Sequence, residues 1–192
     1  VICAALSDGV CKVTNIDYSD DIIATIESMK SLGAVITKKD DYLEVIGIKS
    51  PDNKVNDNID SERTIDCNES GSTLRFLVPI AALFEGVNRF VGRGNLGKRP
   101  LNTYYEIFDE QGIKYSYKEG ILDLKTEGKL KAGEFKVKGN ISSQFITGLL
   151  FTLPLLEGDS KIVITTEMES KGYIDLTLSA IKDFGVEIIN NN

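Results

Sequence analysis

Apolar positions along this chain follow one order three times. An apolar run ends at a glycine, a β-rich stretch follows, an amphipathic run ends at a second glycine, and a strand comes next. The first glycines are Gly9, Gly86 and Gly158, and the second are Gly33, Gly112 and Gly185. Each glycine suits the position after a helix, where the left-handed backbone conformation disfavours side chains. The recurrence indicates three copies of one structural unit.

The apolar runs before the first glycines have almost no polar face, which is typical of buried helices. We expect two of these helices over residues 74–84 and 145–156. Pro79 and Pro154 should kink them or mark irregular turns. Strands, some of them joined into hairpins, are expected at residues 10–15, 34–37, 42–48, 87–92, 113–117, 121–125, 161–166 and 186–189. The pattern predicts an α/β (α+β) fold with buried central helices and outer mixed sheets.

The length of 192 residues and the hydrophobic content of 42% suit one domain with a sizeable core. We divide it into unit one at residues 1–66, unit two at 67–139 and an incomplete unit three at 140–192. The Asp- and Asn-rich stretch at 49–62 is expected to be a solvated connector within the domain. Because Val1 lies inside an apolar run without a helix cap, and the sequence stops where the third hairpin should turn, we expect a domain truncated at both ends.

The formal net charge of −7 argues against a general nucleic-acid or membrane surface, so any phosphate site must be a local basic cluster. No apolar run approaches the roughly 20 residues that a membrane helix needs. The lack of histidine excludes His-based triads and argues against a zinc site, so no metal is expected. Cys3, Cys11 and Cys67 lack metal-type spacing and are expected to be reduced, buried thiols of a cytoplasmic protein.

Polar clusters stand where the buried helices should begin, and helix starts attract anions through unpaired N–H groups and the positive end of the dipole. Ser70 and Ser142 lie at equal distances before Gly86 and Gly158, so they mark equivalent helix starts. The first cluster continues with Gly71, Ser72 and Arg75, and the second with Ser143 and Gln144. A glycine there would let an anion approach the backbone, whereas the serines and the glutamine are equally explained as helix caps.

Two arginines and a third polar cluster extend this group. Arg75 lies one turn into its helix and could face the same anion or bond polar groups of a neighbouring copy. Arg99 stands at the expected start of the next helix, where its charge opposes the dipole. Two parallel hydrogen bonds from the guanidinium to a phosphate or carboxylate would explain an arginine at that position. A place on a solvated loop would explain it equally. Ser170 and Tyr173 mark the matching start in unit three, where the tyrosine would either pack or contact a ligand.

Four motifs occur in order along the chain. They are NESGSTLR at 68–75, KRP at 98–100, GNISSQF at 139–145 and SKGYID at 170–175. Together they resemble the signatures of the 5-enolpyruvylshikimate-3-phosphate (EPSP) synthase family, over essentially the whole chain. The resemblance implies one of two similar domains, each built from three βαβαββ units around a pseudo-threefold axis, with helices inside and sheets outside.

The resemblance also implies an activity, which is transfer of the enolpyruvyl group of phosphoenolpyruvate to the 5-hydroxyl of shikimate 3-phosphate. Phosphate is released, no metal or organic cofactor takes part, and glyphosate competes with phosphoenolpyruvate in this step of aromatic amino acid biosynthesis. Phosphoenolpyruvate would contact Gly71, Arg99 and Gln144. Shikimate 3-phosphate would contact Ser142, Ser143, Gln144, Ser170 and Tyr173, with Ser72 and Arg75 in support.

In the family, the catalytic groups come from residues that precede the equivalent of Val1 and from a second domain of the same chain. The fragment alone is therefore expected to be inactive. One alternative is the UDP-N-acetylglucosamine enolpyruvyltransferase family, which shares the fold but usually has a cysteine in the loop equivalent to residues 92–98, where this chain has none. Another alternative is a non-catalytic anion-binding module on the same fold.

Overall fold

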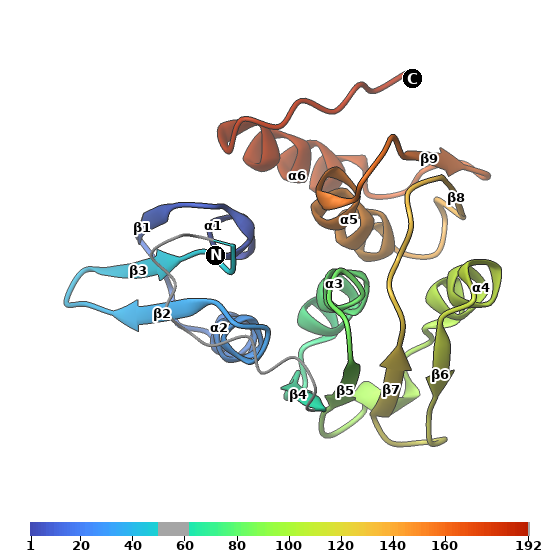
Figure 1. Cartoon of the computed structure of the whole chain (residues 1–192), viewed down its shortest axis with the longest axis horizontal. Coiled ribbons are helices and arrows are strands. Elements are labelled where there is room, and N and C mark those ends of the chain that lie inside the picture. The colour runs from blue at the N-terminus through green and yellow to red at the C-terminus, as the bar shows by residue number, and fades with distance from the viewer. Residues whose placement is uncertain (50–61, 192) are drawn as a thin grey trace.

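Three small sheets surround a central group of helices in a computed structural model that describes residues 1–49 and 62–191 (Figure 1). This arrangement confirms the predicted α/β (α+β) class with helices inside and sheets outside. The stretch predicted to be a connector, residues 49–62, lies almost wholly outside the described residues.

The first sheet is antiparallel throughout and has the spatial order β1-β3-β2. The elements of this part are α1 (Ile2–Leu6), β1 (Val10–Thr14), α2 (Asp20–Ser31), β2 (Val35–Lys38) and β3 (Tyr42–Ile46). Helix α2 begins after Ser19, whose hydroxyl accepts a hydrogen bond from the backbone N–H of Ile22. The predicted hairpin of β2 and β3 is confirmed.

The second sheet has the order β4-β5-β7-β6, with β4 parallel to β5 and the other pairs antiparallel. Its part of the chain contains β4 (Arg63–Asp66), α3 (Gly71–Ala81), β5 (Val87–Val91), the 3₁₀ turn η1 (Leu96–Lys98), α4 (Asn102–Gln111), β6 (Lys114–Ser116) and β7 (Asp123–Glu127). Strand β4, placed in unit one by the sequence, pairs with β5 of unit two. The unit boundaries themselves stay a prediction.

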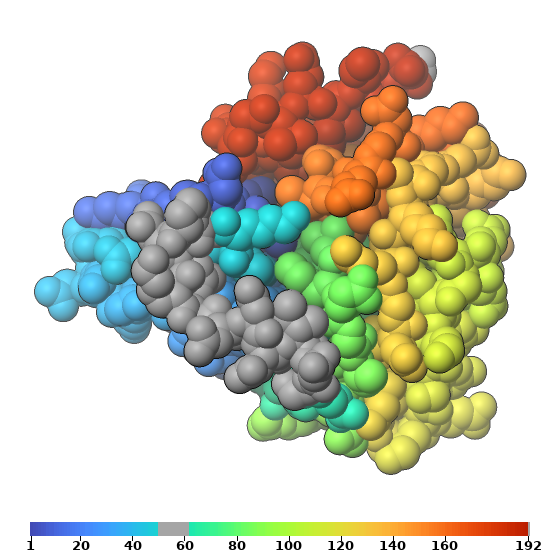
Figure 2. Space-filling view, in the orientation of Figure 1, coloured from blue at the N-terminus to red at the C-terminus, as the bar shows by residue number. Residues whose placement is uncertain are grey.

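The third sheet contains two parallel strands, β8 and β9. Its elements are β8 (Glu134–Val137), α5 (Ser143–Thr152), η2 (Leu153–Leu155), β9 (Lys161–Ile164) and α6 (Lys171–Asp183). On the face drawn in Figure 2, α6 lies along the top edge. The strand predicted at residues 186–189 does not form. A strand needs a hydrogen-bonded neighbour, and within residues 62–191 no sheet offers one to this segment.

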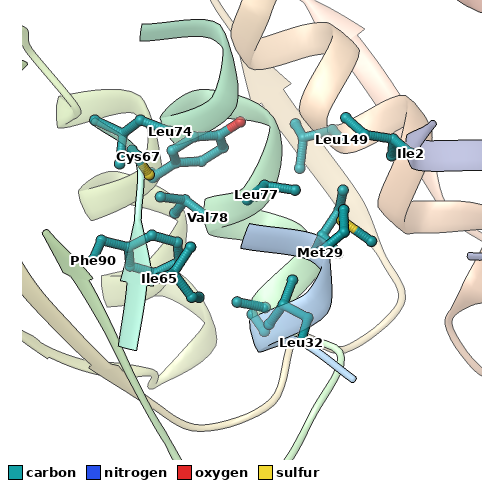
Figure 3. Close-up of a cluster of buried hydrophobic side chains, with 14 of the residues drawn as sticks. Ile2, Met29, Leu32, Ile65, Cys67, Leu74, Leu77, Val78, Phe90 and Leu149 are labelled. Atoms are coloured by element: carbon teal, nitrogen blue, oxygen red, sulfur yellow. The ribbon is translucent and has the colours of Figure 1, made fainter. Parts of the chain in front are cut away.

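The core is centred on α3 and α5, which pack against each other. Nine residues of α3 are buried, including Leu77 and Val78 with no exposed surface, so the prediction of an apolar central helix is confirmed. Figure 3 shows side chains from α2, β4 and β5 gathered around this helix. Gly148 of α5 permits the close approach, because a Cβ there would lie 2.6 Å from the backbone oxygen of Arg75.

The glycine prediction is confirmed for one set and only in part for the other. Gly112 follows α4 directly, Gly33 and Gly185 follow α2 and α6 after one further residue, and all three have positive φ angles, of 71°, 106° and 81°. The first glycines do not end helices, because α1 and α3 end several residues earlier, at Leu6 and Ala81, but Gly86 and Gly158 do have the expected positive φ angles, of 96° and 109°. α1 leaves through Ser7 in an extended conformation (φ −69°, ψ 165°), so the chain needs no left-handed residue there.

The two prolines act differently. Pro79 lies inside α3, which continues to Ala81, whereas Pro154 lies in η2 after α5 has ended at Thr152. The prediction of an irregular turn is therefore confirmed for Pro154, since a proline interrupts the helical hydrogen-bond ladder.

Candidate anion-binding site at converging helix starts

The serine at the start of α3 is a helix cap. Ser70 is 3% exposed, and its Oγ accepts a hydrogen bond from the backbone N–H of Thr73 at 3.2 Å and another from the Thr73 hydroxyl at 2.8 Å. The hydroxyl of Ser72 lies 3.2 Å from the same oxygen. Ser70 therefore stabilises the helix start. Any anion there would be bound by backbone N–H groups and by the neighbouring side chains.

Gly71, the first residue of α3, lies against the guanidinium of Arg99. A Cβ on Gly71 would come within 2.6 Å of Arg99 Nη1 and 3.1 Å of its Cζ. Only a residue without a side chain leaves room for a cation directly over the helix start. The absence of a side chain at position 71 thus admits Arg99, an effect that sequence analysis had attributed to the approach of a ligand.

Arg99 does not open a helix, contrary to the sequence-based expectation. It follows η1 in an extended conformation (φ −78°, ψ 128°), and α4 begins only at Asn102. The following Pro100 disfavours helical geometry at position 99, which explains the difference. The prediction that the charge of Arg99 opposes a helix dipole is therefore wrong. The side chain is exposed, and no acceptor for its guanidinium is found in the part of the chain that the structure describes.

Arg75 connects the starts of α4 and α5. Its Nη1 donates to Oε1 of Gln144 at 2.8 Å, and its Nη2 donates to the carbonyl oxygen of Pro100 at 3.5 Å. The guanidinium also lies 5.0 Å from the centre of the Phe145 ring. Of the two roles left open by the sequence, bonding to polar groups of a neighbouring copy is the one observed.

Burial and a neighbouring positive charge both disfavour the charged form of Arg75. The residue is 9% exposed, and among residues 1–49 and 62–191 its Nε has no hydrogen-bond partner. Burial lowers the pKa of Arg75, and the nearby charge of Arg99 lowers this pKa further. Two neighbouring guanidinium groups make a local positive cluster in a chain of net charge −7, as an anion site requires.

The start of α5 presents Ser142, Ser143 and Gln144. The Ser142 hydroxyl accepts a hydrogen bond from the backbone N–H of Gln144 at 3.3 Å, so Ser142 is a cap. Ser143 is 9% exposed, and its hydroxyl has no partner among the described residues. Because Oε1 of Gln144 is occupied by Arg75, the NH₂ group of this side chain remains a donor for a ligand.

Ser170 and Tyr173 make no hydrogen bond to this cluster in the described residues. The loop before α6 is joined to the loop before α5 by the Glu169 N–H, which donates to the Gly139 carbonyl at 3.1 Å. Ser170 adopts a left-handed conformation (φ 58°, ψ 38°), and its side chain caps nothing. Tyr173 is 68% exposed, so the packing role left open for it is not observed.

Two residues that support the site were not foreseen. The hydroxyl of the buried Tyr104 donates to the backbone oxygen of Arg75, and burial raises the pKa of Tyr104. Thr25 of α2 and Thr73 of α3 share a hydrogen bond of 2.8 Å. Tyr104 stands on the buried face of α4, where an apolar ring is expected, so its sequence position gives no sign of the contact.

Two further features are absent from the described part of the chain. Residues 1–49 and 62–191 hold no group of three His, Cys, Asp or Glu side chains that could bind a metal ion. No helix within these residues is long and apolar enough to cross a membrane.

Two solved structures resemble this chain and define the class of its fold. EPSP synthase from Acinetobacter baumannii superposes on the whole chain with a TM-score of 0.76 at 18% identity, and the chain covers 43% of that structure. The enolpyruvyl transferase NikO from Streptomyces tendae gives a TM-score of 0.53 over 95% of this chain and 40% of its own, at 10% identity. At such identities the likeness is one of fold, which is that of the enolpyruvyl transferases.

The sequence comparisons are more specific. The family described as EPSP synthase (3-phosphoshikimate 1-carboxyvinyltransferase) matches residues 1–192. The 3-phosphoshikimate 1-carboxyvinyltransferases of Clostridium beijerinckii and Clostridioides difficile are 86% and 71% identical over the whole chain, which spans 44% and 45% of their lengths. The chain belongs to the EPSP synthase family, and this match favours that family over the UDP-N-acetylglucosamine enzymes.

Proposed function

We propose that this chain forms part of an enzyme that transfers the enolpyruvyl group of phosphoenolpyruvate to the 5-hydroxyl of shikimate 3-phosphate, with release of phosphate. The observation that carries the proposal is the guanidinium of Arg99 over Gly71, beside the buried guanidinium of Arg75. Both substrates bear phosphate, which planar guanidinium groups bind with paired hydrogen bonds. Cys67 is buried as expected, whereas Cys3 and Cys11 are only half-buried, and the three free thiols support a cytoplasmic location.

Each candidate residue has a proposed role. Gly71, Arg99 and the NH₂ group of Gln144 face phosphoenolpyruvate. The Ser143 hydroxyl, unpartnered in the described chain, joins Ser142, Gln144, Ser170 and Tyr173 around shikimate 3-phosphate. Ser72 and Arg75 support them, Arg75 by holding the glutamine oxygen.

The proposal assigns the proton transfers to groups outside these residues. The chain spans less than half the length of the curated relatives described above. We infer that a second domain completes the active site around the positive cluster. The 192-residue chain alone is therefore expected to bind shikimate 3-phosphate weakly and to release no phosphate from the two substrates.

Titration of ¹⁵N-labelled chain with shikimate 3-phosphate tests this proposal. We expect chemical-shift changes centred on residues 142–144, weakened about tenfold in Gln144→Ala, since one charge-assisted hydrogen bond is lost. Gln111→Ala is the matched control, because the Gln111 side chain at the far end of α4 bonds only to the Lys131 backbone within the part of the chain that the structure describes. Absence of any shift at residues 142–144, or equal weakening in both variants, would overturn the binding role. Phosphate release by the chain alone would contradict the assignment of catalysis to other groups.

A further inference from the structure

A cavity is lined in part by Pro100 and Phe145, the two residues that Arg75 also contacts. It has a volume of ≈ 410 Å³ and opens between the start of α4, the end of β8 and the residue after β9. Its polar lining consists of Asn102, Thr103, Glu106, Lys136, Lys138 and Thr165. None of these residues belongs to the candidate site described above.

The start of α4 gives this cavity unpaired donors. The helix has ten residues, and its N-cap is Leu101, which has no side chain able to bond the free N–H groups. The N–H of Tyr104 is satisfied by the Leu101 carbonyl, whereas those of Asn102 and Thr103 have no partner in the described chain. Two donors at the positive end of a helix favour an anion.

Thr103 supplies the second, independent observation. The residue is only 7% exposed, yet it lines the cavity, and its hydroxyl has no hydrogen-bond partner within residues 1–49 and 62–191. The fully buried side-chain atoms without a partner in the described chain are Arg75 Nε and Thr126 Oγ1, so the Thr103 hydroxyl keeps some accessible surface and can donate to a group in the cavity. A ligand oxygen in the cavity would satisfy it.

Two lysines determine the sign of the charge on the cavity lining. Lys136 and Lys138 stand two residues apart, on the exposed side of a stretch whose intervening Val137 is 1% exposed. The only carboxylate near Lys136 in the described chain is Glu134, at 3.8 Å, and none contacts Lys138. Glu106 adds one opposing charge, so the lining is net positive. The apolar wall of Ile141, Phe145 and Pro100 suits a carbon skeleton.

We propose that this cavity binds the phosphate group of a small organic phosphate. The phosphate accepts hydrogen bonds from the N–H groups of Asn102 and Thr103 and from the Thr103 hydroxyl. Lys136 and Lys138 neutralise its charge, and the organic part lies on Phe145 and Ile141. The inference does not depend on the proposed transferase activity, because its hydrogen-bonding and charged residues are not those of the candidate anion-binding site.

The test uses ¹⁵N-labelled protein titrated with inorganic phosphate and with phenyl phosphate at constant ionic strength. We expect the backbone amides of Asn102 and Thr103 to shift with both probes, and phenyl phosphate to bind about tenfold more tightly because its ring buries apolar surface. Lys138→Gln should weaken binding about fivefold, and Glu106→Gln should strengthen it by a similar factor, since each removes one exposed charge contact. Lys182→Gln, on the exposed end of α6, should change nothing.

Two further variants separate this cavity from the cluster around Arg99. Thr103→Val should weaken binding while Arg99→Gln leaves the shifts at Asn102 and Thr103 in place. The proposal is overturned if Lys138→Gln binds phosphate as the unmodified protein does, or if Arg99→Gln abolishes the shifts. Because the lysines and Glu106 are exposed, their variants are expected to fold even if Thr103→Val does not.

Discussion

The guanidinium of Arg75 on α3 holds the side-chain amide of Gln144 on α5 through a hydrogen bond of 2.8 Å. The two residues come from different copies of the repeat, so this bond joins the helix starts that form the candidate site. Because the amide oxygen is occupied, the orientation of the amide is set and its NH₂ group remains available. The pair thereby couples the packing of the core to the geometry of the site.

A double-mutant cycle measures this coupling. Arg75→Met and Gln144→Ala should each lower the free energy of unfolding, and the double variant should be less destabilised than the sum by about 1 to 2 kcal/mol, as expected for a hydrogen bond to a charged group. Urea unfolding of the four proteins gives the values. Additivity within about 0.3 kcal/mol would show that the bond contributes nothing in solution.

Replacing Gly148 or Gly71 by alanine should change stability by different amounts, because the new Cβ would meet different kinds of atom. In Gly148→Ala the new Cβ would lie 2.6 Å from the backbone oxygen of Arg75 and 3.1 Å from the ring of Pro79, so α3 and α5 must separate. We expect a loss of about 2 to 3 kcal/mol in the free energy of unfolding, the usual cost of overpacking a core. Thermal and urea unfolding measure it.

Gly71→Ala is the matched substitution. There the Cβ meets the flexible end of Arg99, which can move, and the helix gains from alanine. We expect stability to stay within about 1 kcal/mol of the unmodified protein, while the displaced guanidinium weakens phosphate binding about threefold. Equal destabilisation in both variants would mean that Arg99 is fixed in place rather than free to move.

The repeat and its buried helices could be predicted because they depend on local periodicity. The wholly apolar face of residues 74–84 required burial wherever the helix was placed, and the left-handed glycines after α2, α4 and α6 follow from backbone sterics alone. The strand expected at 186–189 shows the limit of this reasoning. Its sequence favours an extended chain, but strand formation depends on a neighbour that local sequence does not specify.

The contacts within the candidate site could not be predicted in the same way. Arg99 lies over Gly71 only because η1 turns the chain back before α4, across a separation of 28 positions that no local pattern encodes. Both residues and the charge of Arg99 can be identified from the sequence. The sequence pattern, however, suggests that Gly71 makes room for a ligand and not for Arg99. Tertiary contacts determine which partner each polar group finds, within one copy for Arg99 and Gly71 and between copies for Arg75 and Gln144.

The centre of the core gives a prediction about stability. Leu77 of α3 has no exposed surface and lies among side chains of α2 and α5 (Figure 3). Leu77→Ala should lower the free energy of unfolding by about 3 kcal/mol, because it removes buried methyl groups and leaves a cavity. Leu176→Ala on α6, where the leucine is 68% exposed, serves as control and should change stability by less than about 0.5 kcal/mol. Similar losses in both would contradict a core centred on α3.

The ion pair network on the second sheet predicts how stability depends on pH. The carboxylate of Asp123 is 10% exposed in its side chain and accepts hydrogen bonds from Arg89 Nε at 2.7 Å. Lys118 Nζ lies 2.8 Å from its other oxygen. These two cations hold the pKa of Asp123 well below its ordinary value, mainly through the hydrogen bond from Arg89.

Because this pKa is depressed in the folded state, the stabilisation is fully present above the unfolded pKa of about 3.9 and is lost as the pH falls from there through the folded pKa. Asp123→Asn should therefore lower stability at pH 7 and flatten its dependence on pH in the acid range. Thermal unfolding between neutral and acid pH measures both effects. Asp40→Asn, an exposed position on the turn between β2 and β3, should leave the profile unchanged. An unaltered profile in Asp123→Asn would show that the network contributes nothing to the acid sensitivity of the fold.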